Sequence, residues 1–201
     1  MGRRGRGMGR QRMNRPGPRR SPGARKDTAL GPNAQQRLRE AHDQLKSGDP
    51  AAAAATFARM AEVAAGKGRH GMATHLALQG VRAHAHAGDT DAATGLASTA
   101  VQYGAPAQNQ RKVAQRFSKA VKALRDAGHD AAADAVAETA RTKMQIQKLP
   151  EVPEAQPVNR AVRRSLPKQC SACGAPVSSA EVAFGENGTA DCHYCGTVLL
   201  G

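Results

Sequence analysis

The sequence predicts a mainly α-helical body of three antiparallel helical hairpins, followed by a small C-terminal β module. Three observations lead to this fold class. Alanine is abundant while aromatic residues make up only 2% of the 201 residues, and such a composition favours helices over strands. One pattern occurs three times at an offset of 40 residues, and all four cysteines lie in two close pairs near the end of the chain.

The first segment, residues 1–32, consists largely of Gly, Arg and Pro. Residues 1–26 contain nine Arg, one Lys and no acidic residue, so they carry ten of the fourteen net positive charges. Because this composition cannot bury enough apolar surface to fold, we expect a disordered tail. The tail resembles the Arg-Gly-rich segments of RNA-binding proteins, which implies polyanion contacts by Arg3, Arg4, Arg6, Arg10 and Arg12. A merely solubilising tail, or a true start at Met8 or Met13, is the alternative interpretation.

The repeated pattern predicts a helical domain over residues 33–147. Its three copies share a glycine that can end a helix in the left-handed conformation, at Gly48, Gly88 and Gly128. Two of these glycines precede an aspartate that can cap the next helix, Asp49 and Asp89. Each copy also follows its own amphipathic segment, most clearly the one with Val113, Phe117, Ala120, Val121 and Leu124. The pattern therefore predicts six helices in three hairpins.

Small and apolar residues recur at fixed distances after each of these glycines. Five residues later stand Ala53, Ala93 and Ala133; nine later stand Phe57, Ala97 and Ala137; twelve later stand Met60, Ala100 and Ala140. The segment in this respect resembles the tetratricopeptide repeat family, which implies stacked hairpins and protein binding. The period of 40 residues exceeds the usual length of about 34, and we expect the extra length between hairpins, at residues 66–71 and 104–110. An irregular helical bundle is the alternative.

Residues 148–168 hold four prolines and predict an extended linker, and residues 169–201 hold the cysteines. The spacing is two residues within each pair, Cys170 with Cys173 and Cys192 with Cys195. Two such turns can place four sulfurs around one Zn²⁺ ion, and in a reducing compartment close thiol pairs favour a metal over disulfides.

The cysteine spacing, with a strand pattern after the second pair, resembles a zinc ribbon with rubredoxin-type knuckles. The resemblance implies one structural Zn²⁺, because a four-thiolate site leaves no open position for a substrate. An iron site of the rubredoxin kind is the alternative. Rubredoxin cores are aromatic, however, and residues 169–201 contain only two aromatic residues of this kind, Phe184 and Tyr194. His193 is expected on the surface. A thioredoxin-like redox role is not favoured, since neither pair lies in a βαβ pattern.

A basic surface is expected on a helix over residues 108–126. Its polar half carries six cations, among them the candidate polyanion contacts Arg111, Lys112, Arg116, Lys119 and Lys122. This surface can face phosphates, dock an acidic partner or simply be solvated.

The sequence offers no motif for an enzyme: we find no phosphate-binding loop and no nucleophile with a supporting base. We therefore expect a non-enzymatic adaptor that binds a protein through its helical repeats and uses the zinc ribbon as a second recognition module. The alternative is a protein that binds nucleic acid or the ribosome through the tail, the basic helix and the ribbon. No segment approaches a membrane span or a secretory signal, so a cytoplasmic location is expected. The sequence leaves the oligomeric state open.

Overall fold

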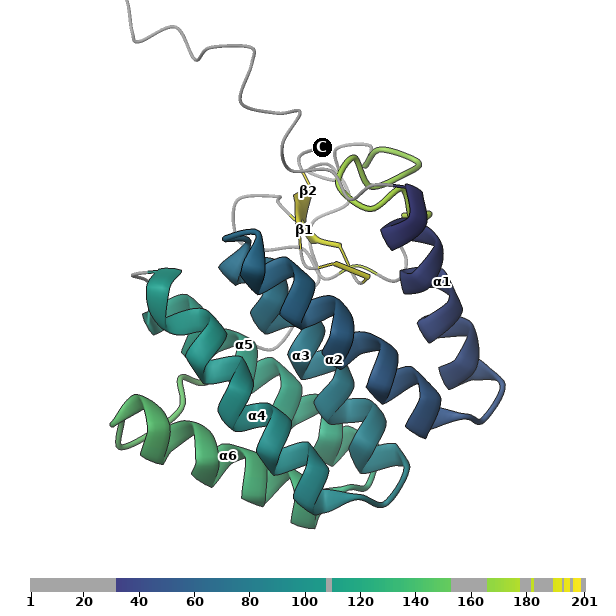
Figure 1. Ribbon diagram of the computed structural model, residues 1–201. Helices are drawn as coiled ribbons and strands as arrows, with labels where there is room; N and C mark the ends of the chain where they lie inside the picture. Colours follow the sequence, from purple (N-terminus) through teal and green to yellow (C-terminus); the bar gives the residue numbers. More distant parts are fainter. Residues whose placement is uncertain are drawn as a thin grey trace, which may run out of the picture.

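The computed structural model describes residues 32–107, 110–152, 166–177, 182, 190–192, 194, 195 and 197–199. Residues 1–31 of the predicted basic tail, with the five arginines predicted as polyanion contacts and both alternative start methionines, lie outside the described residues, as do most of the predicted linker and His193. Within them the chain forms six helices and one two-stranded antiparallel sheet (Figure 1). The helices are α1 (Pro32–Lys46), α2 (Pro50–Gly66), α3 (His70–His86), α4 (Thr90–Gly104), α5 (Gln110–Asp126) and α6 (Asp130–Met144). The mainly helical fold class is therefore confirmed.

A single turn geometry joins most of these helices. Gly48, Gly88 and Gly128 have positive φ angles of 87°, 78° and 81°, as expected for helix-ending glycines. Gly68, which the 40-residue pattern did not include, has a φ of 69° and ends α2 in the same way. In all four turns the residue after the glycine donates a backbone hydrogen bond of 2.9 Å to the carbonyl five residues earlier. The turn therefore joins every pair of consecutive helices except α4 and α5, since α4 continues into the 3-10 helix η2 (Ala105–Ala107).

This turn changes the explanation of the long period. The helices after α1 begin at residues 50, 70, 90, 110 and 130, so the repeating unit is one helix and its connection, 20 residues long. Residues 66–71, where we expected a longer connection, hold only a three-residue turn between α2 and α3. That expectation was wrong, because the additional residues lie in the helices, of 15 to 17 residues each. Only the connection from α4 to α5 is longer.

The core is built from small side chains that let helices approach closely. All nine residues predicted from their distance to the repeated glycines are buried. The largest fully buried side chains, Phe57 and Phe117, come from α2 and α5. Glycine allows the closest approaches: a Cβ atom on Gly80 would lie 2.6 Å from Leu96 Cδ2, and one on Gly104 would lie 2.7 Å from Val113 Cγ2. Glycines on one helix therefore face large side chains on its neighbour, so that the space between the helices is filled.

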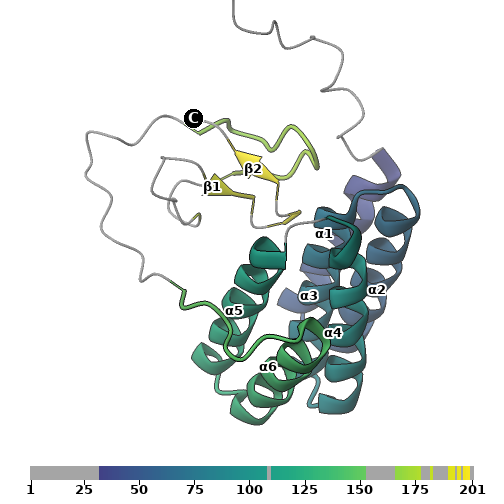
Figure 2. The same ribbon diagram turned by 90° about the vertical axis from the view of Figure 1, so that its left-hand side faces the viewer.

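The hairpins stack in chain order. α3 packs against both α2 and α4, whereas the third hairpin joins the second through α6 on α4 and α5 on α3. The first helices of the hairpins, α1, α3 and α5, lie toward the C-terminal module in Figure 2, and α2 and α4 lie on the far side. The two groups differ in charge: the first helices contain ten Lys and Arg against three Asp and Glu. The second helices contain three against five, so the basic side of the body faces the module.

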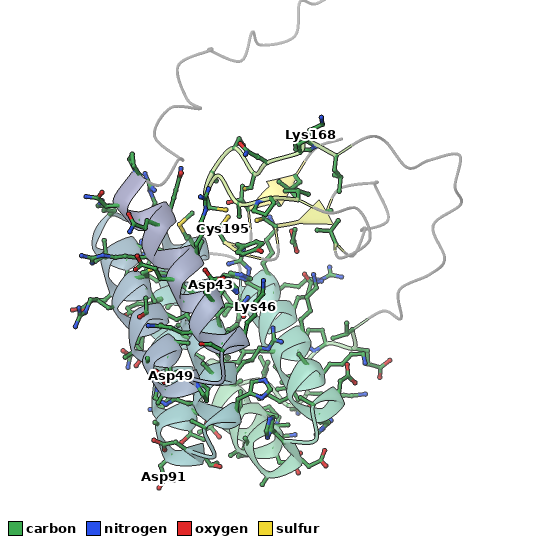
Figure 3. The ribbon with its side chains drawn as sticks, turned by 90° about the vertical axis from the view of Figure 1, so that its right-hand side faces the viewer. Asp43, Lys46, Asp49, Asp91, Lys168 and Cys195 are labelled. Atoms are coloured by element: carbon green, nitrogen blue, oxygen red, sulfur yellow. The ribbon has the colours of Figure 1, made fainter. Side chains whose placement is uncertain are left out.

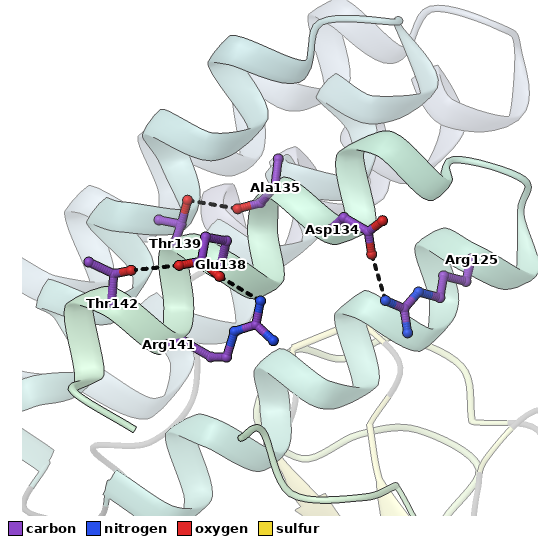
Figure 4. Close-up of polar contacts among 7 residues, drawn as sticks. All are labelled: Arg125, Asp134, Ala135, Glu138, Thr139, Arg141 and Thr142. Atoms are coloured by element: carbon purple, nitrogen blue, oxygen red, sulfur yellow. Dashed lines mark hydrogen bonds and ion pairs between the residues drawn. The ribbon is translucent and has the colours of Figure 1, made fainter. Parts of the chain in front are cut away.

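Surface ion pairs support the third hairpin. Arg125 of α5 reaches Asp134 of α6 at 2.6 Å, and within α6 Glu138 pairs with Arg141 at 2.5 Å and accepts a hydrogen bond from Thr142 at 3.2 Å (Figure 4). These groups are exposed, so each ion pair contributes little to stability. Hydrophobic burial between the helices accounts for most of it.

Candidate metal centre and the helical face beside it

The four cysteines come together in the C-terminal module, although the second pair begins 22 residues after the first. All four are buried and reduced, and their Sγ atoms lie within 4.8 Å of one another. The Sγ atoms of Cys170 and Cys195 are 3.7 Å apart, and so are those of Cys173 and Cys192. Figure 3 shows Cys195 at the side of the module next to the helices and Lys168 at its far end. The structure thus brings all four predicted ligands together.

The sulfur spacing fits a tetrahedral ion. With metal–sulfur bonds of about 2.3 Å, two sulfurs of a tetrahedral zinc site lie about 3.8 Å apart. The two 3.7 Å separations match this edge, and they far exceed the distance of about 2.05 Å in a disulfide. The four cysteines can therefore hold a metal ion such as zinc.

Local backbone bonds shape the two cysteine turns. The Gly174 N–H donates to the carbonyl of Cys170 at 2.8 Å, and Gly174 has a φ of 69°, as the chain needs to turn back after the pair. In the second turn the Cys192 N–H donates to the carbonyl of Thr197 at 2.8 Å. The strands β1 (Ala190–Asp191) and β2 (Val198–Leu199) flank this turn and pair antiparallel, which confirms the strand predicted after the second cysteine pair.

The four thiols lie so close together that their pKa values shift in different directions. Hydrogen bonds from Cys173 and the other two thiols lower the pKa of Cys170. Hydrogen bonding to Cys170 and burial both raise the pKa of Cys173. Four thiolates this close repel one another, so a divalent cation is needed for all of them to ionise together. The site is chemically suited to a cation, and among the His, Cys, Asp and Glu side chains of the described residues the four cysteines alone form the ligand group.

Three polar or aromatic contacts, among others, join the module to the helical body. Arg39 of α1 donates from Nη2 to the carbonyl of Gly174 at 3.1 Å. Tyr194 packs edge-on against His42 of α1, with ring centroids 4.5 Å apart. Lys119 of α5 pairs with Asp191 at 3.1 Å. The module therefore lies across α1 and α5, a contact that the sequence gave no local signal for.

The predicted polyanion contacts on α5 have mixed surroundings. Lys119 pairs with Asp191, and Lys122 pairs with Asp126 of its own helix at 2.8 Å. Arg116 donates to the carbonyl of Gly71 in α3. Arg111 and Lys112 are exposed near the start of the helix. Much of the predicted basic surface is thus engaged within the chain.

The helical face beside the module holds residues that the sequence analysis did not select. A cavity of about 380 Å³ opens between α1 and α3, lined by His42, Leu45, Gly48, Pro50, Gln79, Arg82 and His86. His42 joins this cavity to the module, since the same ring contacts Tyr194. A lone Arg on an alanine-rich helix carries no recognisable pattern, so Arg82 could be found only from the three-dimensional arrangement.

The fold and the site together define a helical, repeat-like protein with a four-cysteine cluster that can bind a metal ion. No family model, curated protein or solved structure matches the chain. None of the described helices is both long enough and apolar enough to span a membrane.

Proposed function

We propose that the protein is a non-enzymatic adaptor. The helical body binds a protein partner on the side of α1, α3 and α5, in the manner that the resemblance to tetratricopeptide repeats implies. Cys170, Cys173, Cys192 and Cys195 hold one structural Zn²⁺, which would supply the cross-link that a module of this size needs to fold. A reducing compartment such as the cytoplasm keeps the thiols available for it.

The observation that carries this proposal is the open, basic cavity on the first helices, beside the docked module. Stacked helical hairpins with a hollow on one face present an extended surface to a partner. The module borders this hollow through His42 and Tyr194, so both parts of the chain can contact the same partner.

Nucleic-acid binding is the second candidate, favoured by the charge of the first helices and by the ten-charge tail. It draws less support from α5, because Lys119 and Lys122 are already paired with acids. Binding of this kind weakens steeply with rising salt and loses affinity when residues 1–26 are deleted.

Affinity capture of the full chain from native lysate, with and without nuclease, separates the two candidates. The adaptor proposal expects protein partners that survive nuclease and the deletion of residues 1–26. If nuclease removes every partner, the adaptor proposal is wrong and the nucleic-acid proposal stands.

A further inference from the structure

Arg82 is an unusual cation for its surroundings. It lies half-buried on α3, where its only hydrogen-bonding partner among the described residues is Gln79, with Nη1 at 3.4 Å from Oε1. None of the ion pairs in the described part of the chain includes it. Removal from water lowers the pKa of Arg82, and no acid offsets this effect. A guanidinium removed from water gains from a hydrogen-bonded or charged partner, and the described residues give Arg82 one long hydrogen bond within its own helix.

Arg116 on the neighbouring helix α5 is a comparable arginine whose charge has partners in the described residues. It is similarly half-buried, but it donates to the carbonyl of Gly71, and Asp191 raises its pKa against the effect of burial. Among the described residues, Arg116 thus has a carbonyl partner on another helix and a nearby acid, whereas Arg82 has only Gln79 of its own helix and lines the cavity.

The cavity at Arg82 contains no acidic residue among those that line it. Besides Arg82 it offers His86, whose Nδ1 is 2.9 Å from Nε2 of His129. Burial, His129 and Arg82 together lower the pKa of His86, so an anion bound here would favour its protonated, hydrogen-bond-donating form. A guanidinium and an imidazole at one hollow are donors suited to carboxylate and phosphate oxygens.

We propose that the cavity between α1 and α3 binds one oxyanion, a carboxylate or a phosphate group, carried by an acidic segment of the protein partner, with Arg82 as the anchoring cation. The inference rests on the proposed adaptor function and names the chemistry of its partner. A peptide is favoured over nucleic acid because the hollow holds one isolated cation, whereas a nucleic-acid backbone is tracked by rows of cations.

The test uses the full, zinc-loaded chain and fluorescence anisotropy of labelled short peptides. One peptide carries several glutamates, the second a single phosphoserine, and the third has glutamine in place of each acid. We expect the first or the second to bind, the third not to bind, and Arg82→Gln to weaken binding about tenfold or more. The matched control is Arg125→Gln, since Arg125 belongs to the same group of helices but is exposed and paired with Asp134.

Thermal unfolding of the same variants separates a binding role from a structural one. Because Arg82 is a half-buried charge with no counter-ion among the described residues, Arg82→Gln should leave the Tm unchanged or raise it while it weakens peptide binding. A lowered Tm with unchanged binding would overturn the proposal, as would equal losses for Arg82→Gln and Arg125→Gln. An RNA oligonucleotide that binds through Arg82 when neither acidic peptide does would also overturn it.

Failure of this inference is distinguishable from failure of the adaptor proposal. If nuclease-resistant partners are captured equally by the wild type and by Arg82→Gln, the adaptor proposal survives and the oxyanion site is wrong.

Discussion

Loss of the metal should weaken the helical body without unfolding it. We consider Cys173→Ser, which removes one of the four buried thiols, or chelation of the wild type. Either change leaves three or four thiols packed without a cation, and the module should unfold because its strands are only two residues each. The three contacts of the module with α1 and α5 are then lost together.

The size of the effect follows from those contacts. The exposed pair of Lys119 and Asp191 contributes about 0.2–1 kcal/mol. The edge-on pair of His42 and Tyr194 contributes about 0.5–1.5 kcal/mol, and the hydrogen bond from Arg39 a similar amount. Ordering of the side chains opposes these gains, so we expect a loss of about 1–3 kcal/mol. At about 4 °C for each kcal/mol, the Tm of the helices should fall by roughly 4–12 °C.

Far-ultraviolet circular dichroism measures this Tm directly, because the helical signal comes from the body. Chelator should lower the Tm of the wild type and have no further effect on Cys173→Ser. Asp191→Asn is the control that leaves all four thiols in place, and its Tm should fall by less than that of Cys173→Ser. If neither chelator nor Cys173→Ser changes the Tm of the helices, the module does not stabilise the body through these contacts. If either change removes the helical signal completely, the body does not fold independently of the module.

Three further predictions concern the body and the composition of the site. Gly95→Ala should stabilise α4 by about 1 kcal/mol, because alanine is the better helix former and a Cβ atom there meets nothing within 4 Å. Gly104→Ala in the same helix should destabilise the protein by about 1–3 kcal/mol, because its Cβ would collide with the β-branched side chain of Val113. Urea titration measures the stability of both variants, and equal effects of the two substitutions would contradict the packing described above. The lowered pKa of His86 means that the unfolded chain binds its proton more readily, so stability from this group is lost as pH falls below about 6.5. Urea titrations at pH 7.5 and 5.5 should therefore show a smaller drop in stability for His86→Gln than for the wild type, and equal drops would refute the assignment. Elemental analysis should find about one zinc per chain, and none in a variant with all four cysteines replaced by serine.

Sequence reasoning reached the helical hairpins because their signals are local. Gly48, Gly88 and Gly128 are spaced regularly, and the alanines that follow them mark the buried face of each second helix. The turn at Gly68 was missed because it lies midway between two copies of the 40-residue pattern, where residues 66–71 were expected to form a longer connection. The same glycine conformation suffices there without a cap, and this turn reveals the 20-residue unit.

The cysteine cluster was predictable from spacing, whereas its position on the body was not. The hydrogen bond from Arg39 to Gly174 spans 135 residues, and no periodicity in the sequence connects its two ends. The same holds for Lys119, because no local pattern in the sequence predicts its ion pair with Asp191, which lies 72 residues further along the chain. Arg82 is likewise an ordinary surface residue in the sequence and acquires its meaning from the cavity between two helices.

The uniform turn between helices has a consequence for how the protein is made. Most contacts in the body join helices that are neighbours in the chain, and proteins dominated by such short-range contacts fold quickly. The body precedes the cysteines in the chain, so during synthesis it can fold before the last cysteine pair leaves the ribosome. The cysteine module then meets a surface of α1 and α5 that is already formed, and any metal bound by the four cysteines would be captured after the helices have folded.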